Sequence, residues 1–224
     1  HWGLSFVPAT LLAMATAGLL AFVVSMPVFR ITGDFLLILT LGLGEVAKAI
    51  AVNWTDVTGG ARGIRNIPPM RFFSREIIAT APFLVVEWSL IAVVLLCLWR
   101  VHRSAYGAIL KGIRDDELVM QTLGYNTFLH KVSAFVIGGA LAGLAGSFFA
   151  HFRGYISPQS FGLETSVLVF CMCVIGGMGT VWGSIAGALI FWSLPELLRL
   201  TGSATFDAAT WRQLLLGLVL VLTM

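Results

Sequence analysis

The sequence has few charged residues. Of its 224 residues, 11% are charged and 58% are hydrophobic, whereas ordinary soluble domains carry about 25% charged residues. This composition excludes a free-standing soluble globular domain. The formal net charge is only +3, which is too small to indicate nucleic-acid binding through a basic face. We therefore expect partners among membrane lipids and proteins, and no nucleic acid.

Residues that bind metals or form disulfides are also scarce. The three cysteines, Cys97, Cys171 and Cys173, lie in apolar runs and show neither a disulfide framework nor zinc-ligand spacing. The four histidines are scattered, without carboxylates or cysteines at metal-ligand spacing. We therefore predict no metal site.

Motifs for catalysis and nucleotide binding are missing as well. The sequence contains no G-x-S-x-G or H-E-x-x-H motif and no paired carboxylates spaced for acid–base chemistry. The Gly-rich residues 42–44 and 176–179 lack the preceding strand, acidic partner or G-K-[ST] ending of nucleotide sites. We predict that the chain is not an enzyme and binds no cofactor itself. If ATP drives its function, separate partner subunits must hydrolyse it.

Long apolar runs, by contrast, are abundant. A helix needs about 20 apolar residues to cross a bilayer, and in lipid its backbone polar groups must be paired internally. We predict an all-α fold, a polytopic transmembrane helical bundle of about six or seven segments in one domain, residues 1–224. The chain begins at His1 and ends inside an apolar run, so we expect a fragment truncated at both ends. The runs cover residues 5–29, 35–52, 77–99 and 132–152, two crossings within 163–198, and a short run at 214–224.

Most charges fall in two polar segments. Residues 53–76 hold six charged residues and residues 100–131 hold eight. A single predicted span separates the segments, so we expect them on opposite sides of the membrane. Their Lys and Arg counts are four and five, which are too close for the positive-inside rule to orient the chain.

Small residues recur at helical spacing in two places. Small side chains on one helix face let another backbone approach closely, which drives helix association in lipid. In the fourth span one row contains Gly138, Ala142 and Gly146, and a parallel row beside it contains Gly139, Gly143 and Ser147. Further on, Gly179, Gly183 and Gly187 repeat this spacing of small residues. Residues 175–183 (IGGMGTVWG) fit either close packing or a helix break that lines a cavity.

The polar segment 100–131 contains a pattern typical of short amphipathic helices. Residues 115–117 (DDE) resemble the acidic start of a helix, which Gly124 and then Asn126 would end. Leu118, Val119, Thr122 and Leu123 would share one face of this helix. Upstream, Ala105, Ile109, Leu110 and Ile113 form a second apolar stripe. Such helices either lie on the membrane surface or present their apolar face to a partner.

Ionisable residues inside the spans are hypotheses of function, because burying a lone charge in lipid is costly. Glu45 and Lys48 are three residues apart near one end of the second span. They fit equally a structural ion pair or the lining of a pathway. Glu87 lies near the start of the third span, where its carboxylate would reach water at the interface.

Several distinctive strings follow one another along the chain. They are TLGLGEVAK at 40–48, TGGARGI at 58–64, SAYG at 104–107, IRDDE at 113–117, LGYN at 123–126, AFVIGGALAGLAGSFFAH at 134–151, GYISPQSF at 154–161 and VIGGMGTVWGSIAGA at 174–188. In this order and spacing they resemble one known family, the permeases of bacterial ABC importers for branched-chain amino acids, in their LivM-like branch. The resemblance covers nearly the whole chain. Glu87 departs from it, because the family pattern has an apolar residue there.

The resemblance implies a multi-pass subunit of the bacterial inner membrane. Its partners would be a second homologous permease subunit, two cytoplasmic ATP-binding subunits and a periplasmic substrate-binding protein. Residues 100–131 would be a cytoplasmic coupling segment with a short amphipathic coupling helix, and residues 53–76 a periplasmic loop. The residues implied in coupling to the ATPase are Tyr106, Gly107, Ile113, Arg114, Asp115, Asp116, Glu117, Leu123 and Gly124.

The substrate is less closely defined. The resemblance implies branched-chain or other small apolar amino acids, with urea or short-chain amides as the alternative within the same family. A stand-alone channel or secondary transporter is the alternative from another class. Candidate residues of a substrate pathway are Thr40, Glu45, Gly176 and Gly177.

Overall fold

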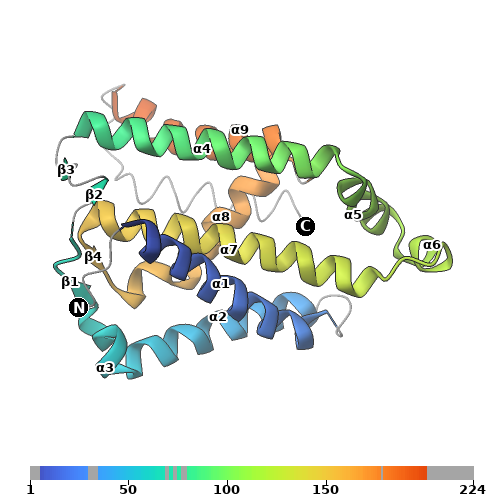
Figure 1. Ribbon diagram of the computed structural model, residues 1–224, viewed down its shortest axis with the longest axis horizontal. Helices are drawn as coiled ribbons and strands as arrows, with labels where there is room; N and C mark the ends of the chain where they lie inside the picture. Colours follow the sequence, from blue (N-terminus) through green and yellow to red (C-terminus); the bar gives the residue numbers. More distant parts are fainter. Residues whose placement is uncertain are drawn as a thin grey trace. The chain divides into compact units, whose positions relative to one another are not determined.

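The computed structural model describes residues 6–29, 35–68, 71–72, 75–76, 80–177 and 179–200 (Figure 1). The described residues are almost entirely helical, which confirms the predicted all-α membrane fold. The short run at 214–224 lies outside them. In chain order the elements are α1 (Phe6–Val28), α2 (Phe35–Asn53), α3 (Thr55–Thr58), the 3₁₀ helix η1 (Gly60–Arg62), β1 (Ile64–Arg65), β2 (Arg71–Phe72), β3 (Arg75–Glu76), α4 (Thr80–Arg103), α5 (Ala105–Asp115), α6 (Glu117–Thr122), α7 (Thr127–Arg153), β4 (Tyr155–Ile156), the 3₁₀ helix η2 (Pro158–Phe161), α8 (Leu163–Gly176) and α9 (Val181–Leu200).

Four segments are long and apolar enough to cross a membrane, by length and composition. They are residues Phe6–Val28, Phe83–Arg103, Thr127–Arg153 and Pro158–Gly176. The chain divides into two compact units, residues 1–159 and 160–224.

Helix α7 is the longest element of the first unit. It begins five residues before the predicted Val132, because the Asn126 side chain accepts a hydrogen bond from the Leu129 amide (3.2 Å). It ends at Gly154, which has φ 63° and donates its amide to the Ala150 carbonyl (2.9 Å). Its 27 residues span about 40 Å at 1.5 Å per residue, which is enough to cross a bilayer.

Helix α1 packs antiparallel along α7. The Phe6 ring lies edge-on to Phe148 (centroids 5.1 Å apart), and the Phe29 ring lies edge-on to Phe135 (5.6 Å). Between these pairs the backbones approach closely through small residues of both helices. The residues in this contact are Ala13, Ala17, Gly18 and Ala21 of α1 and Gly139, Ala140 and Gly143 of α7.

The contact with α1 uses only one of the two predicted small-residue rows of α7. A Cβ on Gly143 would lie 2.5 Å from the Ala13 carbonyl oxygen, and a Cβ on Gly139 would collide with Ala21. Gly138 and Ala142 are exposed. The described residues place no atom within 4 Å of a Cβ on Gly138 or Gly146. Packing of the row that contains Gly138, Ala142 and Gly146 therefore stays a prediction.

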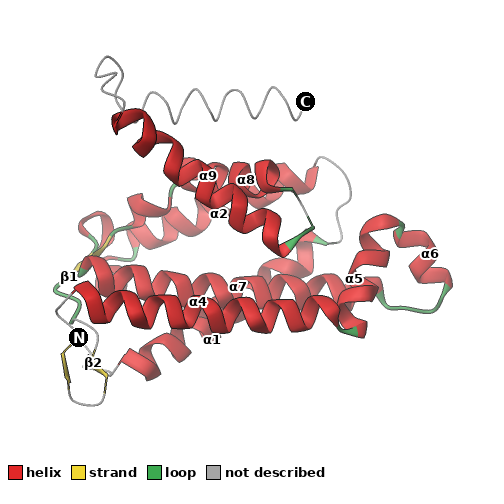
Figure 2. Cartoon of the chain, turned by 90° about the horizontal axis from the view of Figure 1, so that it is seen from above, coloured by secondary structure: helices red, strands yellow, loops and turns green. Residues whose placement is uncertain are grey.

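The two polar segments lie at opposite ends of α7. Figure 2 shows α4 running alongside α7, with α5 and α6 beyond the ends of these two helices. At the other end β1 pairs antiparallel with β4, and the Ile67 amide donates to the Gly154 carbonyl (3.1 Å). Gly63 permits this pairing, because it has φ 67° and a Cβ there would lie 2.9 Å from the Ser157 Cα.

The second unit contains the hairpin of α8 and α9. Gly176, Gly183 and Gly187 form the contact between the two helices; a Cβ on Gly187 would lie 2.8 Å from the Gly176 nitrogen. The helices are interrupted between Gly176 and Val181, where Gly177 and Gly179 adopt positive φ. Both interpretations of residues 175–183 are therefore correct in part: the stretch breaks the helix, and glycines on either side of the break pack the two helices together. Gly179 belongs to the break and not to the packing row.

Candidate functional site

The polar segment between α4 and α7 is built from two short helices. The first, α5, follows α4 after a sharp turn at Ser104, whose hydroxyl accepts a hydrogen bond from the Gly107 amide (3.4 Å). Gly107 is required by this turn, because a Cβ there would lie 2.5 Å from the carbonyl oxygens of both Val101 and His102. The chain therefore leaves the end of α4 in a fixed direction.

Most of the apolar stripe of α5 faces the protein itself. Ile113 is 7% exposed and Ile109 and Leu110 are half-buried, whereas Ala105 at the start of the helix is exposed. The Tyr106 hydroxyl lies 2.6 Å from the Ser133 hydroxyl of α7, and its ring stacks on His130 (centroids 5.8 Å apart). The apolar stripe of α5 is therefore covered largely by its own unit. It needs neither the membrane surface nor a partner's groove to cover it.

The second short helix, α6, begins at Asp116. This carboxylate accepts hydrogen bonds from the backbone amides of Leu118 (2.9 Å) and Val119 (3.1 Å), so Asp116 is the N-cap. The acidic start was predicted correctly, but Asp115 is the last residue of α5 and, among the residues that the structure describes, its carboxylate pairs with the neighbouring Arg114 (3.2 Å). Gly124, with φ 87°, lies directly after the end of the helix, as predicted.

The prediction for Asn126 was wrong. Its side chain does not end α6 but caps the start of α7, as described above. A capping residue and a helix-ending residue look alike in sequence when the connection is only a few residues long, because Asn is favoured in both places.

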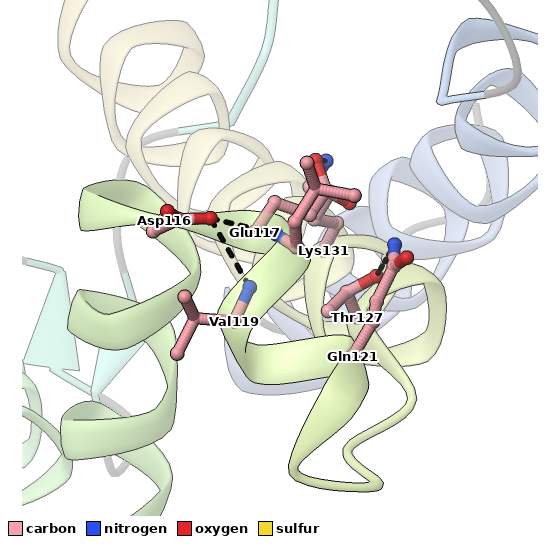
Figure 3. A network of polar contacts seen from close by, with 7 residues as sticks. Asp116, Glu117, Val119, Gln121, Thr127 and Lys131 are labelled. Atoms are coloured by element: carbon pink, nitrogen blue, oxygen red, sulfur yellow. Dashed lines mark hydrogen bonds and ion pairs between the residues drawn. The ribbon is translucent and has the colours of Figure 1, made fainter.

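Helix α6 is fastened to the first turns of α7 by polar side chains (Figure 3). The Lys131 ammonium donates to the Glu117 carboxylate (2.5 Å), and the Gln121 amide donates to the Thr127 hydroxyl (3.1 Å). The hydrogen bond from Lys131 lowers the pKa of the Glu117 carboxyl, and this outweighs the opposite effect of burial. The Glu117 side chain is 37% exposed, so it remains in contact with water.

The apolar face of α6 is left uncovered. Leu118 is 73% exposed and Leu123 is 66% exposed, and Val119 and Thr122 are also exposed. These are the residues that the sequence placed on one face. Beside them a hollow of about 380 Å³ is lined by residues of α6 and α7 and by Phe29. An exposed apolar patch rimmed by polar groups is typical of a surface that another protein covers.

The residues expected to couple to an ATPase therefore fall into two groups. Tyr106, Gly107, Ile113 and Glu117 contact or pack against their own chain. Arg114, Asp115, Asp116, Leu123 and Gly124 are exposed. Sequence reasoning missed His130 and Ser133, and did not assign a role to Lys131. These residues lie on another helix, so no periodicity connects them with α5 or α6.

The candidate pathway residues are divided between the two units. Glu45 and Lys48 pair on α2 (3.5 Å), as the structural alternative predicts, and Thr40 lies on the same helix. Gly176 and Gly177 belong to the end of α8 in the second unit. A pathway role for these residues stays a prediction. Among the residues that the structure describes, no three His, Cys, Asp or Glu residues lie close enough to hold a metal ion.

Glu87 lies in a different environment. It lines a groove of about 430 Å³ between α4 and α7 whose other described lining residues are all apolar, among them Phe83, Leu90, Leu144 and Phe148. The side chain is half-buried. Its position near the start of the span Phe83–Arg103 agrees with a carboxylate close to the interface.

Comparisons with known proteins agree with this architecture. The profile of the branched-chain amino acid transport system permease components matches residues 1–224. The chain is 32% identical to the high-affinity branched-chain amino acid transport system permease protein LivM of Escherichia coli, with 100% of this chain and 56% of the relative covered. The Salmonella typhimurium LivM protein matches to the same extent. The autoinducer 2 import system permease protein LsrC of Salmonella typhi is 28% identical over 83% of this chain and 52% of the relative.

No solved structure matches the chain. The chain spans about half the length of the curated relatives that it matches. The match is to a transport component and not to a catalytic enzyme. With its apolar helices, the chain is a multi-pass membrane protein that belongs to the family of branched-chain amino acid transport system permease components.

Proposed function

We propose that this chain is the membrane-spanning part of a permease subunit in an ATP-driven importer of the bacterial cytoplasmic membrane. The substrate would be a branched-chain or another small apolar amino acid, as the names of the LivM relatives suggest. The single observation that carries the proposal is α6, a short helix with an uncovered apolar face, held beyond the membrane helices by side chains of α7. A channel that works alone has no need of such a surface.

The uncovered face of α6 is the proposed docking site for an ATP-binding subunit. Leu118, Val119 and Leu123 would enter an apolar groove of that subunit, which is a common mode of helix recognition. Residues 100–131 would then be cytoplasmic. Residues 53–76, at the other end of α7, would face the periplasm and the substrate-binding protein. A second permease subunit would complete the membrane part, and ATP would be hydrolysed only by the two ATP-binding subunits.

A second candidate substrate rests on a specific observation. The LsrC relatives are named for autoinducer 2, a different class of small molecule. Urea or a short-chain amide is the further alternative. Uptake assays with labelled leucine, autoinducer 2 and urea distinguish these substrates, because only the transported compound will accumulate in an ATP-dependent manner.

Copurification tests the proposed docking site. We expect Leu118→Asp in the full-length subunit to weaken capture of the ATP-binding subunit by about tenfold or more, because a desolvated apolar contact would become a buried charge. Val57→Asp is the matched control: Val57 is 61% exposed at the opposite end of the first unit, and this substitution should leave capture unchanged. Full transport by the permease subunit alone, without ATP, would contradict the proposed function.

A further inference from the structure

The proposed docking helix has few connections to the membrane-spanning helices. Between α5 and α6 the backbone at Asp116 is extended (φ −154°, ψ 108°), so the two helices do not continue as one rod. At the other end α6 joins α7 through residues 123–126. Besides the route through α5, on which Met120 of α6 packs at Gly112, a movement of α6 reaches the membrane through the side chains that fasten the segment to α7.

Besides the Gln121–Thr127 hydrogen bond, these side chains form two separate links to adjacent turns of α7. In the first, the Tyr106 hydroxyl of α5 lies 2.6 Å from the Ser133 hydroxyl, while the tyrosine ring stacks on His130. In the second, Lys131 donates to Glu117 of α6 (2.5 Å). Two links at different points resist both sliding and rotation, whereas one link would act as a pivot.

We propose that Tyr106 and Ser133, together with Glu117 and Lys131, form a latch that makes α7 the first membrane-spanning helix to follow α6. This inference rests on the proposed function, and it changes the role of two residues. Tyr106 and Glu117 resemble ATPase-contacting positions in the sequence, but their polar atoms are directed at α7. They are positioning residues, and the exposed Leu118, Val119 and Leu123 are left to contact the partner.

Helix α7 is suited to carry such a movement onward. It has no described break between its caps at Asn126 and Gly154, and the glycine contact ties it to α1. At its far end Gly154 accepts the hydrogen bond of Ile67. A displacement at Lys131 would therefore reach α1 and the strand pair β1–β4 without a flexible joint.

The energetics favour an effect on coupling rather than on folding. A partly exposed ion pair contributes little to stability, and the Glu117 and Lys131 side chains are 37% and 28% exposed. The latch is consequently not required to build the segment, which the caps and the Gly107 turn already fix. Its loss should leave the subunit assembled but let α6 move without α7.

The experiment uses the complete importer in proteoliposomes and measures substrate taken up per ATP hydrolysed. Tyr106→Phe and Ser133→Ala each remove the same hydrogen bond, and Tyr106→Phe retains the aromatic ring. We expect each variant, and the double variant equally, to lower the uptake per ATP by about fivefold or more, the scale of a typical coupling free energy. Tyr125→Phe is the matched control, because within the described part of the chain the Tyr125 hydroxyl makes no hydrogen bond.

The ion pair offers a second, independent measurement. Lys131→Glu and Glu117→Lys alone should uncouple uptake from hydrolysis, and the two together should restore it, because the swapped pair has the same attraction. In all variants copurification of the ATP-binding subunit should be unchanged. Unchanged uptake per ATP in the single variants would overturn the latch, as would a failed rescue in the swapped pair. Failure of the proposed function itself would appear earlier, as an absence of ATP-driven uptake by the wild-type assembly.

Discussion

The Cβ of Ala17 on α1 lies 2.7 Å from the point that a Cβ on Gly143 of α7 would occupy. No side chain larger than hydrogen fits at residue 143 unless the two helices separate. In lipid, where association depends on such packing rather than on the hydrophobic effect, this contact should be a principal source of stability for the first unit.

We expect Gly143→Leu to destabilise the protein by about 1–3 kcal/mol, the usual cost of overpacking a well-packed contact. Thermal unfolding of the detergent-solubilised subunit measures the effect. Gly146→Leu is the control, because it adds the same side chain to the same helix at a position where the described residues leave space for it. Equal destabilisation by the two substitutions would mean that the row with Gly138 and Gly146 is packed as well.

The hairpin of α8 and α9 should respond to Gly187→Leu in the same way. A Cβ on Gly187 would lie 2.8 Å from the backbone nitrogen of Gly176, and backbone cannot move aside as a flexible side chain can. We expect a loss of about 1–3 kcal/mol, measured as a lower unfolding temperature. Ala186→Leu serves as the control, since Ala186 is exposed on the same helix.

Removal of the Asp116 cap should loosen α6 selectively. Asp116→Ala leaves the amides of Leu118 and Val119 without their acceptor, which costs about 1 kcal/mol. Hydrogen exchange at these two amides should become roughly fivefold faster, while Asp116→Asn should keep exchange close to the wild-type rate. Asp115→Ala should have no effect, because the Asp115 carboxylate pairs with the exposed Arg114 and accepts no amide of α6 in the described part of the chain. Faster exchange in Asp115→Ala would indicate that Asp115 also holds α6.

Acidification should weaken the attachment of α6 to α7. Lys131 lowers the pKa of Glu117 below its ordinary value of 4.5. The ionised carboxylate therefore adds stability at neutral pH, and this stability is lost as the pH falls through the lowered pKa. We expect less than about 1 kcal/mol, because the pair is partly exposed.

The pH effect can be isolated by comparing wild type with Glu117→Gln. Hydrogen exchange of the α6 amides, corrected for the intrinsic rate at each pH, should differ between the two proteins at pH 6–7. The difference should disappear well below pH 4.5. A difference that persists at low pH would show that Glu117 acts through packing rather than through its charge.

Much of the architecture followed from local patterns. The apolar runs located six helices, with boundaries within a few residues of those observed. The acidic start of α6 and the glycine that follows it were also readable, because capping depends on residues only a few positions apart. The errors were local too: Asp115 ends α5, and Asn126 caps the start of α7.

The candidate site was less predictable, since its polar contacts join residues far apart in the chain. The Tyr106–Ser133 contact spans 27 positions and the Glu117–Lys131 pair spans 14. In both contacts the two partners lie on different helices, so the periodicity of a single helix does not connect them. The sequence indicated an amphipathic segment, but not which of its residues contact α7 and which remain for a partner.

The sequence by itself determined that this protein is an all-α membrane protein, because low charge and long apolar runs leave helices as the solution for the backbone in lipid. It also determined that α7 carries two rows of small residues. Only the tertiary structure decided between the rows. Gly138 and Gly139 are adjacent in sequence and equally small, but they point about 100° apart around the helix, and only Gly139 and Gly143 face the alanines of α1.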